Sequence, residues 1–122
     1  MILVDTPVWI DHLHAADLRL VELLEVDQVG CHALVIEELA LGSISRREVV
    51  LDLLANLRQF PTVQHDEILH LTDRRKLFGR GLSAVDVHLM AAVAVIEGAQ
   101  LWTRDKRLKA ASVDVGVALF DA

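Results

Sequence analysis

The sequence has only one cysteine, no surplus of basic residues and no long uninterrupted apolar stretch. Its single Cys31 excludes an internal disulfide, and no segment has the basic start, apolar middle and small-residue cleavage site of a signal peptide, so we expect a reducing cytoplasm. The longest apolar region, residues 82–102, contains Asp86, His88 and Glu97, which a membrane-spanning helix would rarely carry. We therefore expect one cytoplasmic domain over residues 1–122 without a membrane segment.

The charge balance argues against a protein that coats nucleic acid. The net charge is −6, whereas neutralising phosphates requires a surplus of Lys and Arg. A nuclease is still compatible with this balance, because carboxylates that hold cations count as negative in the sequence. The basic residues form two clusters, each interpreted first as a solvated face and second as a phosphate contact. They are Arg74, Arg75, Lys76 and Arg80 in one, and Arg104, Lys106, Arg107 and Lys109 in the other.

Several common site motifs are also missing. The chain contains no GxGxxG, no GxxxxGKS/T and no GxSxG, so dinucleotide, P-loop and nucleophile-elbow sites have no anchor. The six histidines lack zinc-ligand spacing with the one cysteine. Cys31 lies in a short apolar segment and is predicted to be a core residue rather than a nucleophile.

Strand and helix patterns alternate along the chain, which predicts a parallel sheet with helices on both faces. The expected strands are 2–5, 29–32, 62–64, 99–103 and 115–120. The expected helices are 6–13, 18–26, 33–41, one with apolar residues from 49 to 57, 66–78, 83–97 and 106–111. Thr6 is expected to cap the first helix, with Pro7 in its first turn. Asp17 is expected to cap the second helix, and Ser43 or Ser45 the fourth.

Two aspartates directly follow apolar strands. Asp5 ends the run 1–4, and Asp105 comes just after the apolar segment 101–103. In open α/β sheets ligands bind beyond the carboxyl ends of the strands, so both positions are candidates for a site. Each has a simpler interpretation as the cap of the following helix, although Thr6 could cap the first helix instead.

Two further carboxylates project from apolar helix stripes. Glu38 lies at helical spacing from apolar residues on both sides, and the neighbouring Glu37 is an alternative that periodicity hardly distinguishes. Asp86 shares a stripe with apolar residues, but Ser83 and Asp86 also have the spacing of a capping box. Ionised carboxylates are almost never fully buried without a partner.

The four acidic residues are more informative together than singly. At one rim of a parallel sheet, three or four carboxylates would repel one another unless they were protonated or bridged by cations. Hard oxygen ligands of this kind suit Mg²⁺ or Mn²⁺, and such ions can promote phosphodiester hydrolysis. The pattern therefore predicts a divalent-metal site that acts on a phosphodiester.

Four segments in this order resemble the PIN-domain ribonucleases, in particular the VapC-type toxins of bacterial toxin–antitoxin pairs. The segments are ILVDTPVWIDHL, VIEELALG, LSAVDVHLMAA and LWTRDKRL, and together they span nearly the whole chain. The resemblance implies an α/β/α sandwich with a central, mainly parallel sheet of four to five strands. It also implies a Mg²⁺- or Mn²⁺-dependent endoribonuclease site.

The resemblance transfers residue by residue. It implies that the metal ligands and catalytic residues are Asp5, Glu38, Asp86 and Asp105. Glu37 falls outside the Glu-Leu-x-x-Gly pattern, which matches residues 38–42. Thr6 and Thr103 match hydroxyl residues that could orient a carboxylate or a water molecule. Pro7 departs from the family, which usually has Ser or Asn there, so any polar contact from that position is lost.

The function implied is RNA cleavage by a toxin that a cognate VapB-like antitoxin blocks, often by inserting a basic side chain into the acidic site. Such toxins commonly form homodimers. Two alternatives stay open. One is a catalytically silent interaction module of the same fold, and the other is a phosphoacceptor signalling domain with a single reactive aspartate.

Overall fold

Four short parallel strands form the centre of the molecule. The computed structural model describes residues 1–121 and contains one sheet of order β3-β2-β1-β4. Leu3 of β1 lies opposite Gly30 of β2 on one side and Leu101 of β4 on the other. The strands are β1 (Ile2–Val4), β2 (Val29–Cys31), β3 (Arg58–Gln59) and β4 (Gln100–Trp102). Strand β1 is therefore an interior strand, and the residue that follows it emerges between two neighbours.

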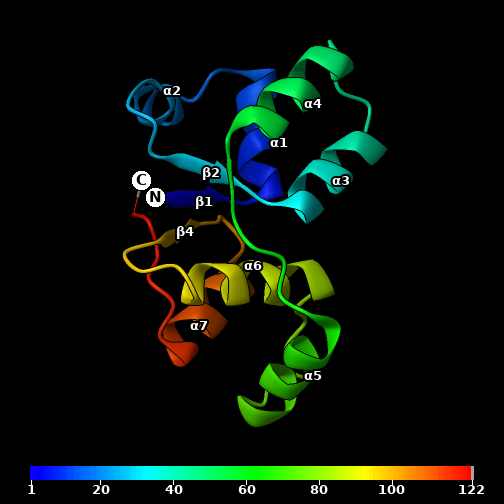
Figure 1. Ribbon diagram of the computed structural model, residues 1–122, viewed down its shortest axis with the longest axis vertical. Coiled ribbons are helices and arrows are strands. Elements are labelled where there is room, and N and C mark those ends of the chain that lie inside the picture. Colours follow the sequence, from blue (N-terminus) through cyan, green and yellow to red (C-terminus); the bar gives the residue numbers. More distant parts are fainter. Residues whose placement is uncertain (122) are drawn as a thin grey trace.

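Helices lie on both sides of these strands (Figure 1). On one side are α1 (Thr6–His14), α2 (Leu18–Glu25), α3 (Ala33–Leu41) and α4 (Arg47–Asn56). On the other are α5 (His65–Arg74), α6 (Ala84–Ala94) and α7 (Lys106–Val115). This confirms the predicted α/β/α fold, with an all-parallel sheet of four strands.

The core forms where apolar strands meet the helices. All three residues of β1 are buried, as expected for a strand covered on both faces. In β2 the absence of a side chain at Gly30 is required by packing. A Cβ there would lie 2.4 Å from Cε1 of Phe60, so the aromatic ring occupies the space that a side chain would need. Phe60 in turn donates its backbone N–H to Cys31 at 2.7 Å, which holds the end of β3 against β2.

Two predicted strands are wrong. The segment 62–64 is irregular, and the strand lies earlier, at Arg58–Gln59. Pro61 explains the difference, because it has no N–H to continue the ladder. The segment 115–120 also forms no regular strand: α7 runs through Val115, and Leu119 makes only an isolated parallel bridge with Leu101. Gly116, with φ of +79°, ends that helix and turns the chain back toward the sheet.

Two predicted helix caps are also wrong. Asp5, not Thr6, is the N-cap of α1, and its carboxylate accepts a hydrogen bond from the N–H of Thr6. Neither Ser43 nor Ser45 caps α4. The N-cap position is Arg46, whose backbone is in the left-handed region and whose side chain makes no capping hydrogen bond. The first residue of α4, Arg47, contacts α3 through its guanidinium, which donates to the carbonyl oxygen of Ala40.

Three helices end three or four residues away from the predicted position. The helix expected at 66–78 ends at Arg74, because Lys76 takes a positive φ of 53° and turns the chain. The helix expected at 83–97 is Ala84–Ala94, and the one expected at 106–111 continues to Val115. Within residues 1–121 no helix is both long enough and apolar enough to cross a membrane.

Candidate functional site

Asp5 lies at the carboxyl end of β1 and is only 4% exposed. Its backbone N–H donates to the carbonyl oxygen of Trp102 at 2.9 Å, which extends the pairing of β1 with β4 by one residue. Its Oδ1 accepts from the N–H of Thr6 at 2.8 Å, and its Oδ2 accepts from the hydroxyl of Thr103 at 2.7 Å. The carboxylate is therefore fixed between the ends of two adjacent strands.

Thr103 connects the two strand-end aspartates. Its buried hydroxyl donates to Asp5 and accepts the N–H of Asp105 at 3.1 Å. Asp105 itself is exposed and caps α7, since its Oδ1 accepts from the N–H groups of Arg107 and Leu108 at 2.8 and 3.1 Å. Its Oδ2 accepts no hydrogen bond from residues 1–121. Asp105 thus lies beside the site, with one oxygen engaged as a helix cap.

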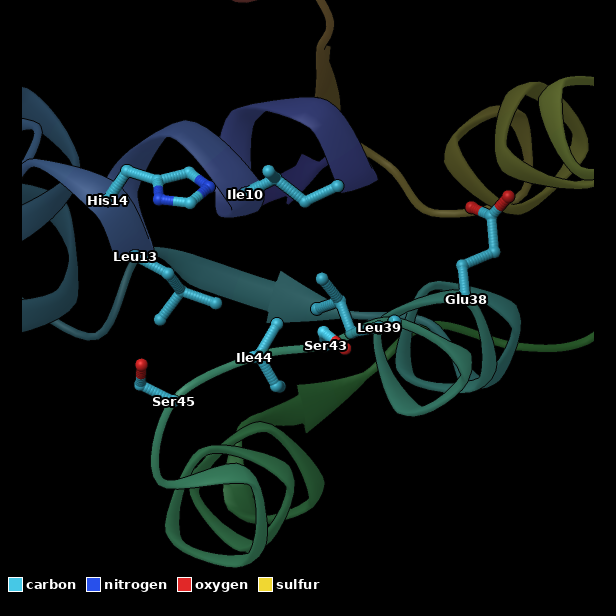
Figure 2. A pocket seen from close by; sticks show the side chains of 9 residues that line it. Ile10, Leu13, His14, Glu38, Leu39, Ser43, Ile44 and Ser45 are labelled. Atoms are coloured by element: carbon cyan, nitrogen blue, oxygen red, sulfur yellow. The ribbon is translucent and has the colours of Figure 1, made fainter.

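Glu38 reaches the same rim from α3. Thr6 donates its hydroxyl to Oε1 of Glu38 at 2.5 Å, so Thr6 contacts Asp5 through its backbone and Glu38 through its side chain. Figure 2 shows the Glu38 side chain projecting from α3 toward the yellow helix, α6, and away from the other residues drawn. Glu37 is exposed and makes no hydrogen bond through its side chain within the described residues. The structure therefore brings Glu38, and not Glu37, to Asp5.

Asp86 belongs to the first turn of α6 and forms the predicted capping box. Its Oδ2 accepts from the N–H of Ser83 at 2.9 Å, and its own N–H donates to Oγ of Ser83 at 3.1 Å. The side chain nevertheless faces the site closely enough that its charge raises the pKa of Asp5. Asp86 is both a helix cap and a neighbour of Asp5.

The pKa of Asp5 is raised above its ordinary value of 3.8, mainly because burial disfavours the ionised form. The Thr103 hydroxyl and the Thr6 N–H oppose this by stabilising the carboxylate, whereas the charges of Asp86 and Glu38 add to it. An ionised Asp5 therefore lies in a desolvated position between two negative groups. A bound cation would relieve both costs.

The donors suit a hard divalent ion. All are carboxylate or hydroxyl oxygens, and Mg²⁺ is usually held by one or two carboxylates with water completing its coordination. Within residues 1–121, no three Asp, Glu, His or Cys side chains lie close enough together, in their present conformations, to ligate one ion. The arrangement fits an ion held by Asp5 and one neighbouring carboxylate.

A small pocket lies between α1, α3 and the loop that follows α3 (Figure 2). It has a volume of about 160 Å³ and mainly apolar walls, including Ile10, Leu13 and Ile44. Glu38 stands at its edge, with its carboxylate turned away toward α6. The pocket thus adjoins the acidic site through the same helix, α3.

Several other polar and titratable residues stabilise the fold through ion pairs, burial or a helix cap. Arg104, from the second basic cluster, forms ion pairs with Asp11 and with Asp17, the latter at 2.9 Å. Cys31 is fully buried, which confirms it as a core residue, and burial raises the pKa of its thiol to about 11. His32, fully buried, caps α3 by accepting the N–H of Leu34 at 3.0 Å. This cap could not be predicted from the sequence, because histidine is not among the preferred N-cap residues.

Known proteins are similar in sequence to this chain over almost its full length. The family model for the PIN domain matches residues 2–114. Two similar proteins, both named Ribonuclease VapC32, come from Mycobacterium tuberculosis strains CDC 1551/Oshkosh and ATCC 25618/H37Rv. Each is 71% identical over 119 residues, which cover 98% of this chain and 96% of the relative. The chain therefore belongs to the PIN-domain family, in its VapC-type group.

Proposed function

We propose that this protein is a divalent-metal-dependent endoribonuclease that acts as the toxin of a toxin–antitoxin pair. The single observation that carries the proposal is the buried Asp5, held by Thr103 and Thr6 with the carboxylates of Glu38 and Asp86 beside it. The name of the two relatives, Ribonuclease VapC32, supports RNA as the substrate.

The candidate metal ligands are Asp5, Glu38, Asp86 and Asp105, with Mg²⁺ or Mn²⁺ as the ion. With the side chains as they stand, Asp5 and one neighbouring carboxylate would hold the ion, and water would complete its coordination. Such an ion, when bound, supplies positive charge to the scissile phosphate and makes water a better nucleophile. Thr103 and Thr6 are positioning residues, because their hydrogen bonds fix both oxygens of Asp5. Asp105 would contribute through Oδ2, which the cap of α7 leaves available.

The Asp5→Asn variant tests the proposal. We expect it to lose cleavage of a labelled single-stranded RNA in the presence of Mg²⁺ or Mn²⁺ while keeping the parent's circular dichroism spectrum. Asp66→Asn is the matched control, because Asp66 is an exposed aspartate in the first turn of α5, outside the site. If Asp5→Asn cleaves RNA as fast as the parent, the proposed mechanism is wrong.

The remaining parts of the proposal concern partners and location. We propose a cytoplasmic protein that forms a homodimer and binds a small VapB-like antitoxin, which would block the site with a basic side chain. Metal titration separates this enzyme from a catalytically silent interaction module. The silent module would bind its partner equally with or without divalent ions and would show no metal-dependent cleavage.

A further inference from the structure

An exposed phenylalanine lies in the loop that leads to Asp86. Phe78 is 63% exposed and is the only exposed residue among the five Phe and Trp side chains, since Trp9, Phe60 and Trp102 are buried and Phe120 is half-buried. Nothing in the proposed mechanism uses it. Exposing an aromatic ring of this size has a cost that a ligand could recover.

Phe78 forms one wall of an apolar pocket between α5 and α6. The pocket has a volume of about 230 Å³. Its other walls include Leu69 of α5, Leu82, and Ala84 and Val87 of α6. Ser83 also lines the pocket, and the same residue shares a capping box with Asp86. The pocket and Asp86 therefore share the first turn of α6.

The loop that carries Phe78 is anchored rather than free. Leu77, the residue before it, is buried and donates its N–H to the carbonyl oxygen of Thr72 at 2.9 Å. The C-terminal end of α7 holds the loop at two more points, where Arg75 donates to the carbonyl oxygen of Asp114 and Arg80 pairs with its carboxylate, both at 2.8 Å. Phe78 is thus a ring presented from a fixed backbone, as a stacking platform requires.

The loop that carries Phe78 is rich in cations in an otherwise acidic chain. Residues 73–80 contain four cationic side chains and one carboxylate, Asp73, whereas the net charge of the whole chain is −6. Arg74 and Lys76 are exposed, and neither forms an ion pair within residues 1–121. An apolar pocket with an aromatic wall and flanking cations complements a nucleic-acid strand, whose flat bases alternate with phosphates. An apolar peptide would leave these cations without partners.

We propose that Phe78 and this pocket bind one unpaired RNA base within two nucleotides of the scissile phosphate, while Arg74 and Lys76 contact the adjacent phosphates. This inference rests on the proposed function for the position of the scissile bond. The base bound there must be unpaired, because it has to leave its stack to enter the pocket.

Binding of RNA can be measured without cleavage in the Asp5→Asn background. A short single-stranded RNA with a fluorescent label would be titrated with Asp5→Asn and with the same chain carrying Phe78→Ala. We expect Phe78→Ala to weaken binding about 5- to 150-fold, which corresponds to the loss of one base–aromatic stack. Phe78→Trp should bind at least as well as the parent. Leu18→Ala is the control, because Leu18 is 75% exposed on α2, away from the pocket.

An abasic scan locates the base. Removing each base of the RNA in turn should identify one position. Loss of the base there should weaken binding to Asp5→Asn but not to Asp5→Asn that also carries Phe78→Ala. The inference is wrong if Phe78→Ala binds RNA as tightly as its parent, or if every abasic penalty persists in full in Phe78→Ala. It is also wrong if Phe78→Ala changes only self-association in sedimentation, which would make the pocket an interface between copies.

The outcomes separate this inference from the proposed function. If Phe78→Ala loses RNA binding but the original protein shows no metal-dependent cleavage, the base pocket is supported and the proposed nuclease function is wrong. Metal-dependent cleavage with unchanged binding in Phe78→Ala would do the reverse.

Discussion

Thr103→Val should destabilise the protein more at neutral pH than in acid. The hydroxyl is buried, donates to Asp5 and accepts the N–H of Asp105, and valine fills the same space without either bond. A hydrogen bond to a charged group contributes about 1.5–3 kcal/mol, and the N–H left without its acceptor adds up to about 1 kcal/mol. We therefore expect Thr103→Val to lower the free energy of unfolding by about 1.5–4 kcal/mol at pH 7.

The pH dependence follows from the state of Asp5. Its pKa lies above 3.8 in the folded protein, so below pH 3.8 the carboxyl is mainly protonated and the Thr103 bond becomes an ordinary neutral one, of about 0.5–1.5 kcal/mol. The cost of Thr103→Val should therefore shrink as the pH falls through this range. Urea unfolding followed by tryptophan fluorescence at pH 7 and near pH 3.8 measures both values.

A buried hydroxyl without a carboxylate partner provides the control. Ser112 is fully buried, and its Oγ has no hydrogen-bond partner within residues 1–121. Ser112→Ala should change the free energy of unfolding by less than about 0.5 kcal/mol, or stabilise the protein, at both pH values. If Thr103→Val costs as little as Ser112→Ala, or the same amount at both pH values, the assigned role of Thr103 is refuted.

Three further predictions concern the site and the sheet. Asp5→Asn should raise the midpoint of urea unfolding at pH 7, because the raised pKa of Asp5 means that its ionised form disfavours the folded state. This gain should disappear below pH 3.8, where the carboxyl is protonated, and an unchanged midpoint at pH 7 would contradict the prediction. Asp86→Asn keeps an oxygen that can accept the N–H of Ser83, so we expect stability within about 0.5 kcal/mol of the parent and loss of RNA cleavage, whereas retained cleavage would make Asp86 only a cap. Gly30→Ala should cost about 1–3 kcal/mol in urea unfolding because its Cβ would meet the ring of Phe60, and a neutral effect would show that the ring moves freely.

The sequence predicted those parts of the fold that depend on local patterns. The apolar run before Asp5 and the capping-box spacing of Ser83 and Asp86 each correspond to the observed element. The third strand could not be placed in this way. It has two exposed residues, and its position depends on the pairing of β2 with Arg58 and Gln59, a contact between distant parts of the chain.

The site was predictable in composition but not in geometry. Strand-end and stripe positions singled out four carboxylates, and the structure links Asp5 to Glu38 through Thr6. Periodicity alone could not choose between Glu37 and Glu38, because both flank the same apolar residues. Nor could it show that Asp105 uses one oxygen to cap α7, since that depends on how the helix starts.

A crystal structure of the protein grown with Mn²⁺, whose anomalous scattering locates the ion, tests the proposed metal site most directly. We expect an anomalous peak about 2.1 Å from a carboxylate oxygen of Asp5, with Asp86 or Glu38 as a second ligand. A fully occupied Mn²⁺ elsewhere, with Asp5 still bonded only to Thr6 and Thr103, would contradict it.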